Sequence, residues 1–352
     1  MADLNWITSR IERAQDRHRR RFEDLYRHGA IDPVMVLGGP PWGRDYKLWA
    51  RQRMDMLDNP RGWIDQVLAD MDKRREMAAD ESIFCPLYIS LDAMGVHFID
   101  ALLGAHVYEH EGDIWNDPLE VDLGDLKMPD LDRSPVMAKW LELARQAVQA
   151  GGGRIPAAFV GTSCPINVGM NVLGQGLLEA LIISPDDARH ALRVMADVIK
   201  GVIARALRVI PEPLRVMGVA YNRYAPSGYG FVDGCATQLL SPGHYAEFFA
   251  PLDAEILSLH RNGGMIHLCG ASAQHIPAWR AMTPLASVQL NDRAADDFEL
   301  YFNGLREDQL IYVAPTAGMS VQRILKISGG RRVVIQTMND QPVLPRSASQ
   351  SA

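Results

Sequence analysis

Cysteine is scarce in this chain. The 352 residues include four cysteines, at positions 85, 164, 235 and 269, and no two of them form a CxxC pair. Widely spaced thiols in a long chain do not make a disulfide framework. We therefore expect free thiols and a reducing compartment, the cytoplasm.

Excess positive charge and long apolar runs are absent as well. The formal net charge is −7 with an isoelectric point near 5.8, which argues against an electrostatic nucleic-acid binder. No apolar run approaches the roughly 20 residues of a membrane span. The amino-terminal residues are polar and charged, so we expect no signal peptide. The glycine-rich loop at residues 38–43 has neither the GxxxxGK[ST] nor the GxGxxG spacing, so we do not interpret it as a phosphate cradle.

Short apolar strands alternate with amphipathic helices along most of the chain. Such alternation predicts parallel strands joined by helical crossovers. About eight strand–helix steps in roughly 300 residues, without a dinucleotide fingerprint, favour an α/β fold of the (β/α)8 TIM-barrel type. We expect residues 1–80 to form a helical extension packed on the barrel, residues 81–340 the barrel itself, and residues 341–352 a frayed tail.

A (β/α)8 barrel carries its active site at the carboxyl ends of its strands. Many polar residues follow the predicted strands, and each also has a plain interpretation as a cap or turn residue. Asp233 is the least easily dismissed, because it stands beside Cys235 and Thr237 before a well-capped helix that begins near Ser241. The polar residues at predicted strand ends are Trp42, Asp92, Ser163, Cys164, Tyr221, Asn222, Arg223, Tyr224, Asp233, Gln238, His267, Cys269, Gln289, Asn291, Thr316, Gln336 and Asn339.

Residues 263–270, with the sequence Gly-Gly-Met-Ile-His-Leu-Cys-Gly, are the most informative stretch. The two glycines end a helix, and the apolar residues after them predict a short buried strand. Because strand side chains alternate, His267 and Cys269 point the same way and can reach one zinc ion. The alternative is a core histidine bonded to backbone beside a small buried thiol.

Three segments together resemble the uroporphyrinogen decarboxylase superfamily, which also contains cobalamin- and coenzyme M-dependent methyltransferases. They are the acidic, proline-bearing residues 122–130, the loop and helix start at residues 232–242, and the glycine-rich residues 263–270. The resemblance covers about residues 80 to 340 and implies the barrel fold.

The resemblance also implies a zinc site, because methyltransferases of the family hold zinc with a His-x-Cys pair and a later cysteine. His267 and Cys269 match the pair, but residues 336–340 carry no cysteine. A third ligand is therefore open among His275, Cys235, Cys164 and Asp233, and we assign His275 first. The arginine-rich amino-terminal motif of the decarboxylases is missing, since residues 38–44 hold only Arg44.

Two enzymatic hypotheses and one non-enzymatic hypothesis follow. The first is a zinc-dependent methyltransferase that moves a methyl group between a corrinoid or small donor and a thiol or other small acceptor. The second is a metal-free carboxy-lyase, in which Asp233 binds or protonates a cationic intermediate. The third is a small-molecule binding protein. A corrinoid protein is a possible partner, and a homodimer is possible.

We expect Asp233 and Tyr224 to be catalytic and His267, Cys269 and His275 to bind the metal. The residues expected to bind substrate are Trp42, Tyr221, Asn222, Gln238, Gln289 and Asn291.

Overall fold

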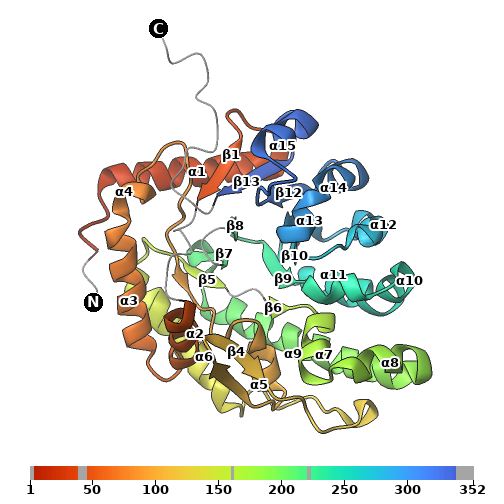
Figure 1. The fold of residues 1–352 in the computed structure, drawn as a ribbon. Coiled ribbons are helices and arrows are strands. Elements are labelled where there is room, and N and C mark those ends of the chain that lie inside the picture. The colour runs from red at the N-terminus through yellow and green to blue at the C-terminus, as the bar shows by residue number, and fades with distance from the viewer. Residues whose placement is uncertain (1–3, 39–45, 160–161, 220–222, 338–352) are drawn as a thin grey trace.

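Seven parallel strands form the main sheet of the computed structural model, which describes residues 4–38, 46–159, 162–219 and 223–337 (Figure 1). Because they are parallel, their carboxyl ends meet at one edge of the sheet. In spatial order the strands are β1 (Met35–Gly38), β13 (Val333–Thr337), β12 (Leu310–Val313), β11 (Leu285–Leu290), β10 (Gly264–Leu268), β9 (Gly230–Asp233) and β6 (Thr162–Ser163).

A second sheet holds β2 (Ile89–Ser90), β5 (Ala157–Phe159), β7 (Arg215–Val219) and β8 (Arg223–Ala225). The first three strands are parallel, and β8 runs antiparallel to β7. One parallel bridge between Leu37 and Phe84 links β1 to the segment that leads into β2.

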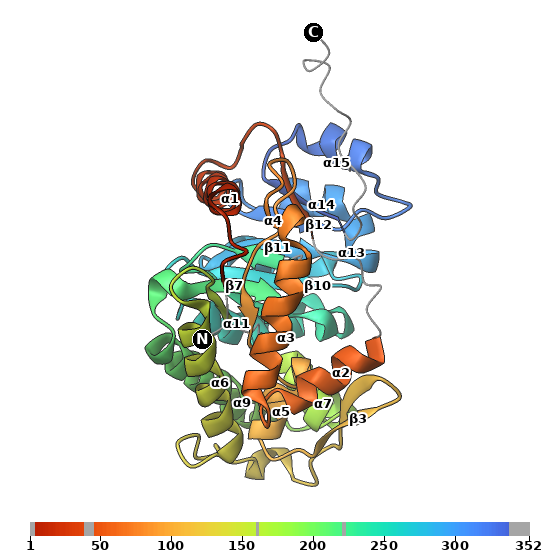
Figure 2. The ribbon, with the colours of Figure 1, turned by 90° about the vertical axis from the view of Figure 1, so that its left-hand side faces the viewer.

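Helices lie outside the strands and cover them (Figures 1 and 2). Their bounds are α1 (Ser9–His28), α2 (Tyr46–Asp55), α3 (Pro60–Lys73), α4 (Arg75–Ala78), α5 (Phe98–Leu102), α6 (Pro135–Gly151), α7 (Pro165–Val172), α8 (Gln175–Ile183), α9 (Pro185–Val209), α10 (Pro242–His244), α11 (Ala250–Leu257), α12 (Ile276–Ala281), α13 (Asp292–Asp296), α14 (Phe298–Gly304) and α15 (Val321–Ser328). One π-helical turn, Tyr245–Phe249, joins α10 to α11.

Local sequence signals account for the helix ends. The side chains of Thr8, Asn59 and Ser134 accept hydrogen bonds from backbone N–H groups in the first turns of α1, α3 and α6. Gly29 ends α1 in a left-handed conformation with φ of 70°. Ser184 behaves differently, since its side chain makes no capping bond at the start of α9.

The mixed α/β class is confirmed. Within residues 83–90 the structure has one short strand, β2 at Ile89–Ser90. Residues 107–116 form an antiparallel hairpin, β3 (Val107–His110) with β4 (Asp113–Asn116). Its two turn residues, Glu111 and Gly112, both have positive φ, which is the backbone of a tight hairpin turn.

The amino-terminal segment contributes to the sheet as well as to the helical cover. β1 precedes residue 80 and pairs with β13 over its full length. Helix α1 packs its buried Phe22 against Phe84, Tyr224 and Tyr312. Residues 1–80 therefore do not form a purely helical extension.

No single helix within the described ranges is long and apolar enough to cross a membrane. Helices α7 and α8 taken together are long and apolar enough, but a bend of 111° separates them.

Candidate metal centre

Three ligand atoms converge where strands β9 and β10 end. The two strands pair in parallel with His267 opposite Asp233, and the Gly234 N–H donates to the His267 carbonyl at 2.9 Å. The chain leaving β9 therefore passes beside the end of β10. The ligand atoms of Cys235, His267 and Cys269 all lie within 4.8 Å of one another, a spacing that a small rearrangement around one ion can close.

Two glycines allow this close approach. Gly263 immediately precedes β10 with φ of +72°, and a Cβ there would collide with the Pro284 carbonyl. At Gly234 a Cβ would lie 2.9 Å from Ile266 Cγ2 and 3.2 Å from the His267 carbonyl oxygen. A larger residue at position 234 would push Cys235 away from β10.

Gln289 fixes the orientation of the His267 ring. The residue lies opposite His267 in the β10–β11 pairing, and its Oε1 accepts a hydrogen bond from His267 Nδ1. Gln289 Nε2 donates to the Leu290 carbonyl at 3.3 Å, which assigns the direction of the amide, and to Gln336 Oε1 at 2.6 Å. With the hydrogen on Nδ1, the Nε2 lone pair of a neutral His267 is available to a metal.

The electrostatics of the cluster favour a neutral imidazole and make one of the two thiols easier to ionise than the other. Burial, with a smaller effect of the Arg223 charge, holds the pKa of His267 well below its usual range. The Cys235 thiol donates a hydrogen bond to the Cys269 sulfur, which lowers the pKa of Cys269 and raises that of Cys235. Zinc binds a neutral imidazole and thiolates, so the lowered pKa values of His267 and Cys269 favour metal binding, whereas the raised pKa of Cys235 opposes it.

Asp233, which we expect to be catalytic, is buried at the end of β9, opposite His267. Burial raises its pKa, and the charges of Arg223 and Arg53 partly offset this effect. Arg223 Nη1 lies 3.8 Å from Asp233 Oδ1. The carboxyl group is therefore held close to two cationic side chains.

Tyr224 is not brought into the cluster. Arg223 and Tyr224 are neighbours on β8, so their side chains leave opposite faces of the strand. Arg223 approaches Asp233, whereas the Tyr224 ring packs edge-on against Phe84 at 5.0 Å. Burial raises the pKa of Tyr224 to about 12, which suits a core residue.

His275 lies outside the cluster, in a buried group that we call the aromatic network, made of Thr237, Tyr245, Asp253, His275 and Trp279. His275 Nε2 donates to the Thr237 carbonyl at 2.9 Å, and its ring lies 4.6 Å from that of Tyr245. Tyr245 donates to Asp253 Oδ2 at 2.8 Å and accepts from Trp279 Nε1 at 2.8 Å. The third atom of the three-atom cluster is the sulfur of Cys235, one of the alternatives that the sequence left open, and not a nitrogen of His275.

Cys164 and Asp233, the two other candidates for a third ligand, lie outside the three-atom cluster. Cys164 is buried, its sulfur points to Asn167 Oδ1 at 3.7 Å, and burial raises its pKa well above the usual range. The Cys164 N–H donates to the Asp233 carbonyl at 2.9 Å, so Cys164 supports the β9 end through its backbone. Neither Cys164 nor Asp233 belongs to the three-atom cluster.

The predicted substrate residues separate into three kinds of position. Gln289 is buried behind His267, while Gln238 is exposed and its side chain lies against Gly270. Asn291 donates from Nδ2 to Asp292 Oδ2 at 2.9 Å, and its N–H donates to the Leu268 carbonyl at the end of β10. Trp42, Tyr221 and Asn222 lie outside the described residues.

Sequence reasoning missed the cationic partners of Asp233. Arg53 comes from α2, about 180 positions away from Asp233 in the chain, and it pairs with Asp92. Arg223 lay inside the polar run 221–224, and the alternation of side chains along a strand was the signal that separates it from Tyr224.

Comparison with solved structures gives a fold relationship. A methyltransferase from Methanosarcina mazei is similar with a TM-score of 0.64 and 12% sequence identity, over 93% of this chain and 95% of that chain. No protein-family model matches the sequence, and no curated protein matches it. At this level of identity the likeness establishes that the two chains share an α/β fold.

Proposed function

We propose that this protein is a zinc-dependent methyltransferase that moves a methyl group between a corrinoid or small donor and a thiol or other small acceptor. The observation that carries the proposal is the convergence of Cys235, His267 and Cys269 at the ends of β9 and β10. The likeness in fold to a methyltransferase supports it.

The donor set suits zinc. Two sulfurs and one imidazole nitrogen are ligands that zinc prefers, and three protein ligands leave a fourth tetrahedral position for a substrate. Gln289 supplies the outer hydrogen bond that metal-binding histidines usually make. Zinc bound there would hold an acceptor thiol as the thiolate, which is the nucleophilic form.

The surrounding residues would position the methyl donor. Asp233 and Arg223 place a carboxyl and a guanidinium group side by side next to the cluster. Gln238 lies over Gly270, just past the end of β10, where it can contact a bound molecule. Residues at this end of the strands therefore offer both charges and a neutral amide to a donor.

We infer that the two sheets belong to one closed arrangement of the (β/α)8 type. The bridge between Leu37 and Phe84 joins them at one side. At the other side β5 and β6 follow one another in the chain, with β5 in one sheet and β6 in the other. A corrinoid-carrying partner would then deliver its methyl group at the carboxyl ends of the strands, the usual active face of such barrels.

A metal-free carboxy-lyase is the second candidate, and the buried Asp233 favours it. Burial raises the pKa of this carboxyl group, so Asp233 can stay protonated nearer to neutral pH and act as a proton donor. Arg223 beside it can bind a substrate carboxylate.

Elemental analysis tests the first proposal against the second. We expect about one zinc per chain in protein purified without chelator, and a loss of most of it in His267→Ala and Cys269→Ser. Cys164→Ser, which changes a buried sulfur outside the cluster, is the matched control and keeps its zinc. Methyl transfer from methylcobalamin to a panel of small thiols then follows the zinc content of the variants.

Zinc far below one ion per chain in the unmodified protein would contradict the proposal. So would full methyl transfer after the metal has been removed, whereas release of carbon dioxide by metal-free protein would support the carboxy-lyase.

A further inference from the structure

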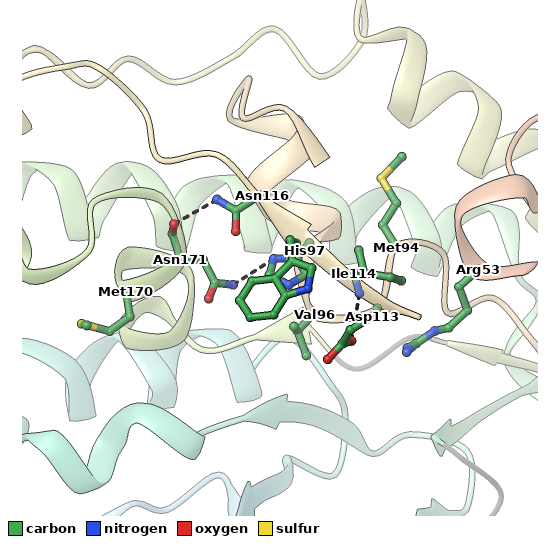
Figure 3. Close-up of a pocket in the computed structure, with 11 residues that line it drawn as sticks. Arg53, Met94, Val96, His97, Asp113, Ile114, Asn116, Met170 and Asn171 are labelled. Carbon is green, nitrogen blue, oxygen red and sulfur yellow. Dashed lines mark hydrogen bonds between the residues drawn. The ribbon is translucent and has the colours of Figure 1, made fainter. Parts of the chain in front are cut away.

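A second polar centre lies in a cavity of about 530 Å³, between the hairpin β3–β4 and helix α7 (Figure 3). This volume is in the range of small-molecule sites. Its walls combine apolar side chains, such as Trp115 and Met170, with a few polar ones. The polar ones include Arg53, His97, Asp113 and Asn171. None of these residues belongs to the metal cluster.

His97 is held in one orientation by a buried carboxylate. Its Nδ1 donates to Asp100 Oδ2 at 2.8 Å, and Asn171 Nδ2 donates to the same oxygen at 2.8 Å. The Asp100 side chain has no exposed surface, whereas that of His97 is 13% exposed. When Asp100 is ionised it only accepts hydrogen bonds, so a neutral His97 then carries its hydrogen on Nδ1 and presents a lone pair on Nε2.

The buried carboxyl group of Asp100 is not fully hydrogen-bonded. Asp100 Oδ1 is buried without a hydrogen-bond partner within the described ranges, and burial raises the pKa of this carboxyl group. The adjoining residues Met94 and Gly95 both have left-handed backbones, with φ of 55° and 56°. Backbone strain of this kind in a non-glycine residue collects at ligand sites.

The walls indicate the chemistry of a ligand. Trp115 is 51% exposed and Val96 is 43% exposed, although both line the cavity. The Arg53 guanidinium is already paired with Asp92, so it does not leave a bare positive charge there. A planar, largely apolar molecule fits these walls better than a highly charged one.

We propose that this cavity binds a planar small molecule carrying one O–H or S–H group, and that His97 accepts its proton. The O–H or S–H bond breaks, the proton moves to His97 Nε2, and the electron pair stays on the ligand as an oxyanion or thiolate. Asp100 then faces the imidazolium through the Nδ1 hydrogen bond. This inference goes beyond the metal centre and does not require it.

The probe is 4-nitrophenol, because its ionised form is coloured and the molecule quenches tryptophan fluorescence on contact. In the unmodified protein, at a pH where the free probe is mostly neutral, we expect quenching of Trp115 together with the colour of bound phenolate. His97→Gln should bind about tenfold more weakly or worse and lose the phenolate signal, since a charge-assisted hydrogen bond is removed.

Matched controls separate proton transfer from general damage. His106 bonds Asp117 at 2.9 Å with its side chain 73% exposed, so His106→Gln removes a similar pair outside the cavity and should leave both signals within twofold. Trp115→Phe should remove the quenching and keep the phenolate colour. Asp100→Asn is the second variant, expected to keep the probe bound but neutral, while 4-nitroanisole should bind without any colour change.

The charged groups facing His97, namely Arg53, Asp100 and Asp113, are unchanged in His97→Gln. Neutral 4-nitrophenol bound equally by the unmodified protein and by His97→Gln would overturn the role of His97. Absence of quenching in the unmodified protein would overturn the ligand class.

Discussion

The metal cluster and the aromatic network lie close together in the chain and contain similar residues, yet they differ in how their polar atoms are used. Each has one predicted zinc-binding histidine, His267 or His275, and each adjoins a buried carboxyl with a raised pKa, Asp233 or Asp253. His275 Nε2 donates a hydrogen bond to the Thr237 carbonyl, whereas His267 donates through Nδ1 to Gln289, so that its Nε2 is available to a ligand. His275 Nδ1 is buried and has no hydrogen-bond partner within the described ranges, so each of the two rings keeps one nitrogen available. His267 differs because two cysteine sulfurs lie within 4.8 Å of its ring nitrogen, so residue type alone does not identify a metal ligand.

The largest effect should come from removing the third ligand. Cys235→Ser should weaken Co²⁺ binding about a hundredfold or more, because ligand loss exceeds the 10–100-fold cost of losing an outer-shell partner. Titration with Co²⁺, followed by its thiolate absorption bands, measures this. Equal Co²⁺ affinity in Cys235→Ser and the unmodified protein would show that Cys235 is not a ligand. The contrast between the metal cluster and the aromatic network would then have to be revised.

An intermediate effect is expected behind His267. Gln289→Leu takes away the acceptor for His267 Nδ1 and should weaken metal binding about 10–100-fold. Gln238→Ala changes an exposed glutamine nearby and serves as the control in the same titration. If both variants bind alike, the orientation of His267 does not depend on Gln289.

The aromatic network should respond in stability instead of metal binding. His275→Ala removes a buried hydrogen bond to Thr237 and packing against Tyr245, and should lower the free energy of unfolding by about 1–3 kcal/mol. Urea denaturation of metal-free protein measures this change. Metal affinity within twofold of the unmodified protein is the second half of the prediction, and a large drop would place His275 in the metal site after all.

The last prediction concerns the pH dependence of stability. Burial raises the pKa of Asp253 from 3.8 to about 7. The folded state then holds a proton that the unfolded state has released, so this group stabilises the fold fully below pH 3.8 and loses that contribution as the pH rises to about 7. Asp253→Asn should flatten the fall in unfolding free energy across this window, as read from urea denaturation at several pH values. An unchanged slope would mean that another group titrates there.

Sequence periodicity predicted the alternating α/β framework well, because caps and strand patterns are local. The helix capped by Ser241 and the strand that carries His267 both follow from neighbouring residues. The hairpin β3–β4 was missed because its turn, Glu111–Gly112, lacks the Asn-Gly or Asp-Gly pair that usually marks such turns.

The site was predictable only where its residues share one strand. The spacing of His267 and Cys269 placed both on one face, and the structure brings both into the cluster. Cys235 and Arg53 reach the site through strand pairing and helix packing, which no local pattern records. His275 was assigned as the third ligand because it is near His267 in the sequence. The intervening turn instead places its ring against the Thr237 carbonyl.

The hairpin β3–β4 gives the molecule a form of modularity. Its ladder is complete within residues 107–116, and it contributes Asp113, Trp115 and Asn116 to the cavity wall. Lengthening or exchanging this hairpin would reshape the cavity without shifting the register of any parallel strand. The ligand preference proposed for the cavity could therefore change in evolution while β9 and β10, which carry the metal cluster, keep their pairing.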